Sequence, residues 1–296
     1  MTLHGISMDR YLHERYFEKD NKDLGKVHSV FQRVINVETG KGDIFSLSHP
    51  RDAYMPFMIQ VRERHDFLME EHLEGKKVCF QNGCLSIGSL EISLDEIEIK
   101  ERIQRKYKIT ESLSESLETA KGILQRYGKR GGCLGYYGQY EDMDLMEKEL
   151  AKRIGSLETE MDFGRLIGFG RGLTPSGDDF SVGLLCAEGY IDFKHTEKET
   201  VIEKITEELK NTIRLNEGDT TDVSRQMLKL SLDEEFPGPL MDLCESIITG
   251  ESAASCRDSM LKLLNIGSTS GTDMATGVIY ALEKAEEERN YGGKYV

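Results

Sequence analysis

The fold of this chain depends most on two matching segments, which read Ser176-Gly177-Asp178-Asp179-Phe180-Ser181-Val182-Gly183 and Ser270-Gly271-Thr272-Asp273-Met274-Ala275-Thr276-Gly277. With the residues around them they share the pattern [ST]-x-S-G-x-D-x-x-x-G-x-x-x-A. Glycine and alanine four residues apart lie on one face of a helix and leave it smooth, so two backbones can approach closely. We therefore expect the two helices to pack face to face, with both Ser-Gly-x-Asp turns at one end. The alternative is a repeat that serves helix packing only.

The rest of the chain predicts strands first and helices after. Short alternating runs around glycine turns predict strands over 34–37, 43–47, 77–80, 84–87 and 90–94. Helical spacing of apolar residues predicts helices over 112–127, 142–154, 178–190, 197–215, 221–230, 239–249, 255–264 and 273–288. This order predicts an α+β protein, with an N-terminal antiparallel β-sheet or small barrel over 1–108 and a mainly helical domain over 109–296.

The composition predicts a water-soluble globular protein, with 38% hydrophobic and 31% charged residues. The formal net charge of −15 disfavours nucleic acid and anionic membrane surfaces as partners. We find no stretch of about 20 apolar residues and no secretory signal. The six cysteines form no CxxC pair, which is typical of reduced thiols and predicts a cytoplasmic protein.

A glycine-rich loop over 168–175 leads into the first segment. Thr174 and Ser176 are expected to cap the helix that begins near Asp178. A loop that feeds a buried helix start presents unpaired N–H groups and the positive end of the helix dipole, which suit phosphate or carboxylate. The glycines match neither a dinucleotide fingerprint nor a P-loop. The alternative is a tight turn with capping residues that binds no ligand.

The candidate site joins the residues of both helix starts. The candidate catalytic residues are Asp179, Asp273 and His28, although a lone histidine before a strand is more often a structural hydrogen-bonding residue. The candidate anion-binding residues are Arg171, Gly172, Thr174, Ser176, Gly177, Asp178, Thr220, Thr221, Ser270 and Gly271. In another interpretation Asp178, Asp179 and Asp273 hold Mg²⁺ through their oxygens, or the aspartates only cap their helices.

Thr220 and Thr221 belong to a third polar cluster, in which one of them is expected to cap a helix that holds Ser224. An ordinary helix cap is the alternative interpretation of this cluster. Because catalytic partners assemble in space, the spacing alone nominates no Ser-His-Asp or Cys-His arrangement.

The string Gly172-Leu173-Thr174-Pro175-Ser176-Gly177-Asp178-Asp179-Phe180, with Gly267-Ser268-Thr269-Ser270-Gly271-Thr272-Asp273-Met274, resembles a bacterial family of AllH-like proteins. That family includes AllH, a subunit of oxamate carbamoyltransferase, and its members have also been labelled carboxylases. The resemblance extends over most of the chain. One departure is Tyr54-Met55-Pro56, where an Asn-Gly-Pro turn is expected, so this chain can differ in the acid it handles.

The resemblance implies phosphorolysis of oxalurate to oxamate and carbamoyl phosphate by one subunit of a multi-protein complex. The implied partners are companion subunits and small anions, namely phosphate, carbamoyl phosphate and an oxamate-like acid. Two other functions fit the same residues: a Mg²⁺-dependent enzyme acting on a phosphoryl or acyl substrate, and a non-catalytic scaffold subunit.

Overall fold

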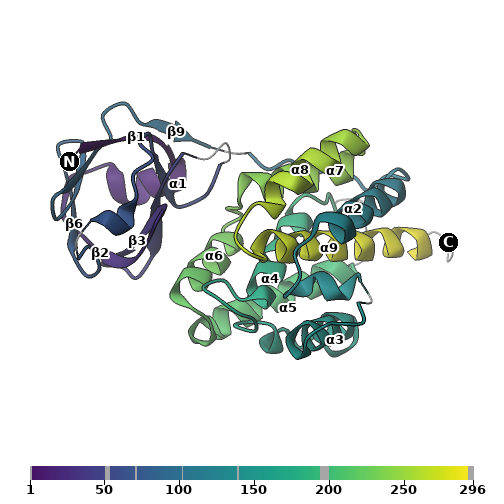
Figure 1. Cartoon of the computed structure of the whole chain (residues 1–296). Helices are drawn as coiled ribbons and strands as arrows, with labels where there is room; N and C mark the ends of the chain where they lie inside the picture. Colours follow the sequence, from purple (N-terminus) through teal and green to yellow (C-terminus); the bar gives the residue numbers. More distant parts are fainter. Residues whose placement is uncertain are drawn as a thin grey trace. The chain divides into compact units, whose positions relative to one another are not determined.

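The computed structural model describes residues 2–50, 54–70, 72–101, 103–138, 140–193 and 200–292. The chain divides into two compact units, one ending at Ile103 and one beginning at Gln104. The first unit is built mainly from strands and the second mainly from helices, so the predicted α+β class is confirmed (Figure 1).

The first unit is a closed β-barrel. Its strands are β1 (Thr2–Asp9), β2 (Asn21–Phe31), β3 (Val34–Thr39), β4 (Ile44–Ser48), β5 (Met58–Val61), β6 (Lys77–Gln81), β7 (Cys84–Ile87), β8 (Leu90–Ser93) and β9 (Glu98–Lys100). Neighbours follow the order β5-β4-β3-β2-β6-β7-β8-β1-β9, and a further pairing of β5 with β1 closes eight strands into a barrel. The predicted barrel is confirmed. Its pairings are mixed, because β1–β8, β1–β9 and β4–β5 are parallel.

The predicted hairpins are present in the barrel. The strands β3 and β4 pair antiparallel, as do β6 and β7. The second hairpin turns at Asn82 and Gly83, with φ values of 49° and 70°, as an Asn-Gly turn should. The sequence pattern does not indicate β1, because Ser7 and Asp9 are among its buried residues and interrupt the apolar alternation. Between β1 and β2 the chain forms the short helices α1 (Arg10–Leu12) and η1 (His13–Phe17).

The second unit contains every helix that the sequence predicts. They are α2 (Leu113–Tyr127), α3 (Leu145–Glu160), α4 (Ser176–Gly189), α5 (Val201–Leu215), α6 (Asp222–Leu232), α7 (Gly238–Thr249), α8 (Ala253–Leu264) and α9 (Ser270–Gly292). Positions 197–199 of one predicted helix lie outside the described residues. In the described part of the chain, no helix has the length and apolar character needed to cross a bilayer.

The helices α4 and α9 pack against each other at backbone contact in the middle of this unit (Figure 1). A Cβ atom on Gly183 would lie 2.0 Å from the Met274 carbonyl oxygen, and one on Gly277 would lie 2.1 Å from that of Phe180. Phe180 and Met274 occupy the same place in the repeated pattern, so the contact is reciprocal. The predicted face-to-face packing of the two segments is confirmed.

Candidate functional site

The starts of α4 and α9 meet at one place in the helical unit. The hydroxyl oxygens of Thr174 and Ser270 are 2.9 Å apart. The Asp179 side chain interacts with Ser270, and the Asp273 side chain interacts with Ser176. Each aspartate therefore contacts the serine of the other segment, which is the juxtaposition that the repeat predicts.

Both of these aspartates are almost fully buried. Asp179 is 1% exposed and Asp273 is 0% exposed, and the Oδ2 atom of each has no hydrogen-bond partner among the described residues. Burial, together with the nearby charge of Asp273, raises the pKa of Asp179 well above its ordinary value. Burial also raises the pKa of Asp273, to about 6, although a hydrogen bond from the Cys133 amide opposes this shift.

A third segment completes the surroundings of Asp273. The Cys133 amide donates to Asp273 Oδ1 at 2.6 Å, and the Cys133 thiol donates to the Ser176 carbonyl oxygen at 3.4 Å. Burial and the two aspartate charges raise the pKa of this thiol well above its usual range. A Cβ on Gly132 would lie 2.2 Å from Asp273 Oδ1, so this approach requires glycine. The paired glycines before Cys133 indicate a loop, but nothing in the sequence pattern shows that this loop reaches Asp273.

Asp178 faces a different part of the structure. Its Oδ1 accepts from the Gly168 amide at 2.7 Å, and its Oδ2 accepts from the hydroxyls of Ser224, at 2.6 Å, and Thr220. Burial raises its pKa, and these hydrogen bonds oppose the shift. Thr221 caps α6 by accepting from the Ser224 amide, as one of the two threonines was expected to do. Asp178 therefore ties the start of α4 to the start of α6.

This orientation separates Asp178 from the other two aspartates of the predicted magnesium site, which stays a prediction. The Asp178 oxygens accept hydrogen bonds from the Gly168 amide and from Ser224 of α6. They do not share the contacts that Asp179 and Asp273 make. Within the described ranges, no group of three or more His, Cys, Asp or Glu side chains has a metal-binding arrangement. Adjacent aspartates at a helix start point in different directions, which the sequence alone does not reveal.

Three backbone amides at each helix start are already hydrogen-bonded. Carbonyls of the preceding turns accept from Gly177, Asp178 and Asp179 in α4 and from Gly271, Thr272 and Asp273 in α9. The expectation of unpaired N–H groups is therefore wrong for these amides. Any ligand at this place would meet side chains first.

The expected side-chain cap of α4 is also absent. Pro175 is the N-cap residue and makes no side-chain cap hydrogen bond, while Ser176 is the first helical residue. Thr174 contacts Ser270 instead of the α4 amides. The hydroxyls of Thr174 and Ser176 thus face the second segment, where they contact Ser270 and Asp273 respectively.

The loops before the two helices correspond, but the first is longer. The Gly177 amide donates to the Phe169 carbonyl at 2.9 Å, and the Gly271 amide donates to the Ile266 carbonyl at 3.1 Å. The first connection is three residues longer, and it contains the predicted site residues Arg171 and Gly172. Gly170 has a φ of 145°, and a Cβ there would lie 2.2 Å from the Ser176 nitrogen, so the loop can close over α4 only with glycine at this position.

Three basic residues lie on the segments next to the aspartates. Arg171 Nη2 is 3.2 Å from Asp144 Oδ2, and Arg130 Nε is 2.9 Å from Glu147 Oε1. Lys129 Nζ donates to the Gly267 carbonyl at 3.0 Å and has no carboxylate partner in the described structure. The Lys129 amide also donates to Thr272 Oγ1 at 3.0 Å, which fixes this residue beside the second segment. Lys129 is a candidate site residue that the sequence pattern does not indicate.

His28 lies in the barrel unit, whereas the aspartates lie in the helical unit. It lies within β2, whereas the sequence predicted it before a strand. Its Nδ1 is 3.1 Å from Ser29 Oγ, which accepts from Asn36 Nδ2 at 3.0 Å. Ser46 Oγ donates to Asn36 Oδ1 at 2.7 Å, so a polar row crosses β2, β3 and β4. The catalytic role of His28 stays a prediction.

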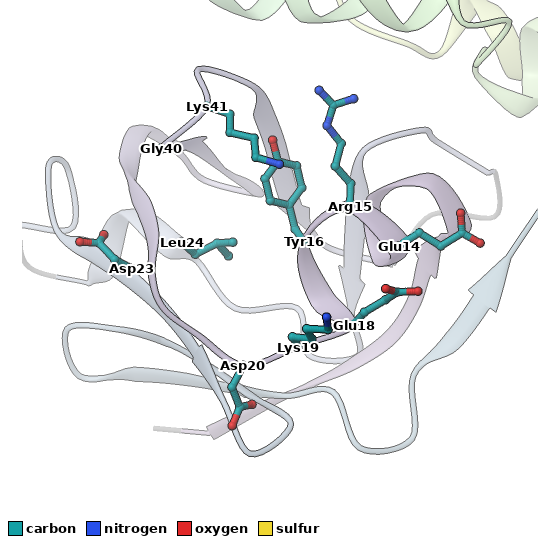
Figure 2. A pocket seen from close by; sticks show the side chains of 10 residues that line it. All are labelled: Glu14, Arg15, Tyr16, Glu18, Lys19, Asp20, Asp23, Leu24, Gly40 and Lys41. Atoms are coloured by element: carbon teal, nitrogen blue, oxygen red, sulfur yellow. The ribbon is translucent and has the colours of Figure 1, made fainter.

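The barrel unit also contains a hollow of about 440 Å³, and Figure 2 shows Arg15 and Lys41 reaching toward Tyr16 within it. Tyr16 donates to Asp43, and Arg15 Nη2 is 3.1 Å from the same carboxylate. Lys41 Nζ lies 5.4 Å from the centre of the Tyr16 ring. The lining carries carboxylates as well as cations, so it presents no clear preference for an anion, and it contains none of the predicted site residues.

The fold defines a class of proteins in which a closed β-barrel unit precedes a helical unit built around two matching loop–helix segments. The family model described as the AllH family N-terminal domain matches residues 4–99, and the model described as oxamate carbamoyltransferase subunit AllH matches residues 166–282. The chain therefore belongs to the AllH family. No curated protein and no solved structure matches the chain. The second model spans both Ser-Gly-x-Asp segments.

Proposed function

We propose that this chain is a subunit of an enzyme that converts oxalurate and phosphate to oxamate and carbamoyl phosphate, and that the paired segments bind its small anionic ligands. The observation that carries the proposal is the pair Asp179 and Asp273, each of which buries one carboxylate oxygen without a partner in the described structure. Buried polar atoms in a core that serves packing alone are almost always hydrogen-bonded. The family description supplies the reaction class.

The reaction needs hydrogen-bond donors and a positive charge at fixed places. A phosphate oxygen attacks the carbonyl carbon of the terminal carbamoyl group, the bond from that carbon to the oxamate nitrogen breaks, and the hydrogen phosphate proton passes to this nitrogen. Negative charge grows on the carbonyl oxygen, where preorganised donors stabilise the transition state.

Side chains at the joined helix starts can supply these groups. The hydroxyls of Thr174, Ser176 and Ser270 lie beside the aspartates, and they can donate to a developing oxyanion. The Lys129 ammonium, which has no carboxylate partner in the described structure, can hold a phosphate or a carboxylate by a charge-assisted hydrogen bond. Since the amides that follow Ser176 and Ser270 are paired, side chains carry this role in the proposal.

Entry of a substrate requires movement of the loop over 168–175. Both aspartates are buried, and Thr174 of this loop contacts Ser270 and interacts with the Asp179 side chain. Gly172 has a φ of 88° and no neighbour within 4 Å of an added Cβ, while its neighbours contact other segments, Arg171 through Asp144 and the Leu173 carbonyl through the Thr221 hydroxyl.

The proposal is tested by phosphate-dependent formation of carbamoyl phosphate from oxalurate in the complex of this chain with its companion subunits. Replacement of Lys129 by Gln should raise the KM for phosphate by about tenfold, because it removes one charged hydrogen bond. The exposed Lys152 on α3 offers a control with the same change of charge, and Lys152→Gln should behave like the parent. An assembled and folded complex without this activity would refute the proposed reaction.

A further inference from the structure

The pair formed by Asp179 and Asp273 has no positively charged partner among the described residues. Each side chain is more than nine-tenths buried, and each leaves its Oδ2 atom without a hydrogen-bond donor. Two carboxylates close together in a medium of low dielectric repel each other, and each pays a large cost for leaving water. A bound cation or a bound proton offsets this cost.

The neighbouring cationic side chains do not supply this charge. Lys129 donates its ammonium protons to a backbone carbonyl, that of Gly267. Arg130 forms a two-point contact with Glu147, through distances of 2.9 and 3.1 Å, and Arg171 reaches Asp144. All three groups thus have other partners, and none forms an ion pair with Asp179 or Asp273 in the described structure.

We propose that one hard divalent cation, Mg²⁺ or Mn²⁺, binds between Asp179 and Asp273 where the two helix starts meet. The unpartnered Oδ2 atoms are its anionic ligands. The hydroxyls of Ser176, Ser270 and Thr174, which already contact the aspartates, supply neutral oxygens. An all-oxygen set of this kind suits a hard cation and not a soft one.

The proposed site differs from the one that the sequence suggests. We do not count Asp178 as a ligand, because its two oxygens accept hydrogen bonds from the Gly168 amide and from the Ser224 hydroxyl of α6. The Cys133 thiol donates its proton to the Ser176 carbonyl, so sulfur is not counted as a ligand. The proposed site therefore consists of one carboxylate from each copy of the motif, with the neighbouring hydroxyls as neutral ligands.

The cation deepens the proposed function, on which it rests only for the identity of the anion. Two carboxylates without a cation repel a phosphate or an oxamate-like acid. A bound divalent ion attracts both the carboxylates and the anion. Binding of the cation itself is a property of this chain and needs neither substrate nor companion subunits.

The test is a titration of the chelator-treated chain with Mn²⁺, in which bound Mn²⁺ loses the electron paramagnetic resonance signal of the free ion. The parent chain should bind Mn²⁺ in a saturable way, with Mg²⁺ as a competitor. Asp179→Asn and Asp273→Asn should each weaken binding by at least about tenfold, since changes outside the ligand shell alone can cost that much. The exposed Asp258 on α8 provides a control, because Asp258→Asn removes the same charge at a distance.

A second measurement does not depend on the folding of any variant. Anomalous scattering from crystals of the parent chain soaked in Mn²⁺ should place a peak between the two carboxylates. Absence of saturable binding by the folded parent chain overturns the proposal, as does binding by both variants with the affinity of the parent, or a peak elsewhere. If Mn²⁺ binds as described but the complete complex forms no carbamoyl phosphate, the cation site stands and the proposed reaction fails.

Discussion

The carboxylate of Asp273 lies close enough to that of Asp179 for its charge to raise the Asp179 pKa, and each carboxylate contacts the serine of the other segment. This crossed arrangement follows from the helix packing below it. Gly183 and Gly277 bring the backbones of α4 and α9 into contact, so the two Ser-Gly-x-Asp turns lie at the same end of the helix pair. Two copies of one motif thus produce a single group of residues, which neither copy could form alone.

Replacement of either buried aspartate by asparagine should not destabilise the cation-free chain. Burial raises the pKa of Asp273 to about 6, so the ionised form that predominates at pH 8 costs the folded state stability relative to the unfolded chain. Asparagine keeps an oxygen that can accept from the Cys133 amide. In chelator-treated protein we expect Asp273→Asn to raise the free energy of unfolding by about 1–2 kcal/mol, measured by urea denaturation.

A scaffold role for the repeat predicts the opposite sign for that variant. If the aspartates serve only to cap and pack the helices, Asp179→Asn and Asp273→Asn should each lower the free energy of unfolding by about 1 kcal/mol. A loss of that size in chelator-treated protein would contradict the present account.

Asp178, although adjacent to Asp179, should behave differently. Its oxygens accept from the Gly168 amide and the hydroxyls of Ser224 and Thr220, so Asp178→Ala leaves several buried donors unpaired. We expect the free energy of unfolding to fall by about 2–3 kcal/mol. Thermal denaturation of Asp178→Ala beside the parent checks this, and an unchanged melting temperature would show that Asp178 does not join α4 to α6.

The helix contact predicts a sharp difference between two glycines. In Gly183→Ala the new methyl group would meet the Met274 carbonyl at 2.0 Å, so the free energy of unfolding should fall by about 2–3 kcal/mol. Gly122 lies in α2 with nothing within 4 Å, and Gly122→Ala should raise it by about 0.5–1 kcal/mol. Equal effects of the two changes in chemical denaturation would be inconsistent with close packing of α4 and α9.

The pair of Glu147 and Arg130 predicts a dependence of stability on pH. Hydrogen bonds from Arg130 lower the pKa of Glu147 to about 2. A folded-state pKa below the unfolded value contributes stability that is present above about pH 4.5 and is lost as the pH falls toward 2. Because Arg130 is partly exposed, we expect a contribution on the order of 1–2 kcal/mol.

Denaturation curves between pH 5 and pH 2, compared for the parent and Glu147→Gln, isolate this contribution. The difference in stability between the two proteins should shrink as the solution becomes more acidic. The exposed Glu141 offers a matched control, and Glu141→Gln should follow the parent at every pH. A constant difference for Glu147→Gln would contradict the assigned pairing.

The sequence predicts those parts of the fold that depend on local patterns. Glycine and alanine four residues apart predict the packing of α4 on α9, and Asn82-Gly83 predicts the β6–β7 hairpin. The closure of the barrel is harder to predict, because β1 pairs with β5 and β8 through contacts between distant parts of the chain. Such pairings leave no local signature.

The site is predicted only in part for the same reason. The repeat identifies Asp179 and Asp273 but cannot show that Asp178 turns to α6, since adjacent carboxylates look alike in a sequence. Cys133 and Lys129 come from a separate segment and reach the site through tertiary contacts. Thr174 appears in the sequence to be a cap, yet in the structure its hydroxyl contacts that of Ser270, and Pro175 is the N-cap residue of α4.

The central claim is that the joined segments form the functional site of a carbamoyltransferase subunit. The most direct test measures phosphate-dependent carbamoyl phosphate formation from oxalurate by the complete complex, assembled with the parent chain, Asp273→Asn or the control Asp258→Asn. The account predicts that Asp258→Asn retains the parent rate and that Asp273→Asn, folded and assembled, lowers kcat by about 100-fold or more. An Asp273→Asn complex that works at the parent rate would contradict it.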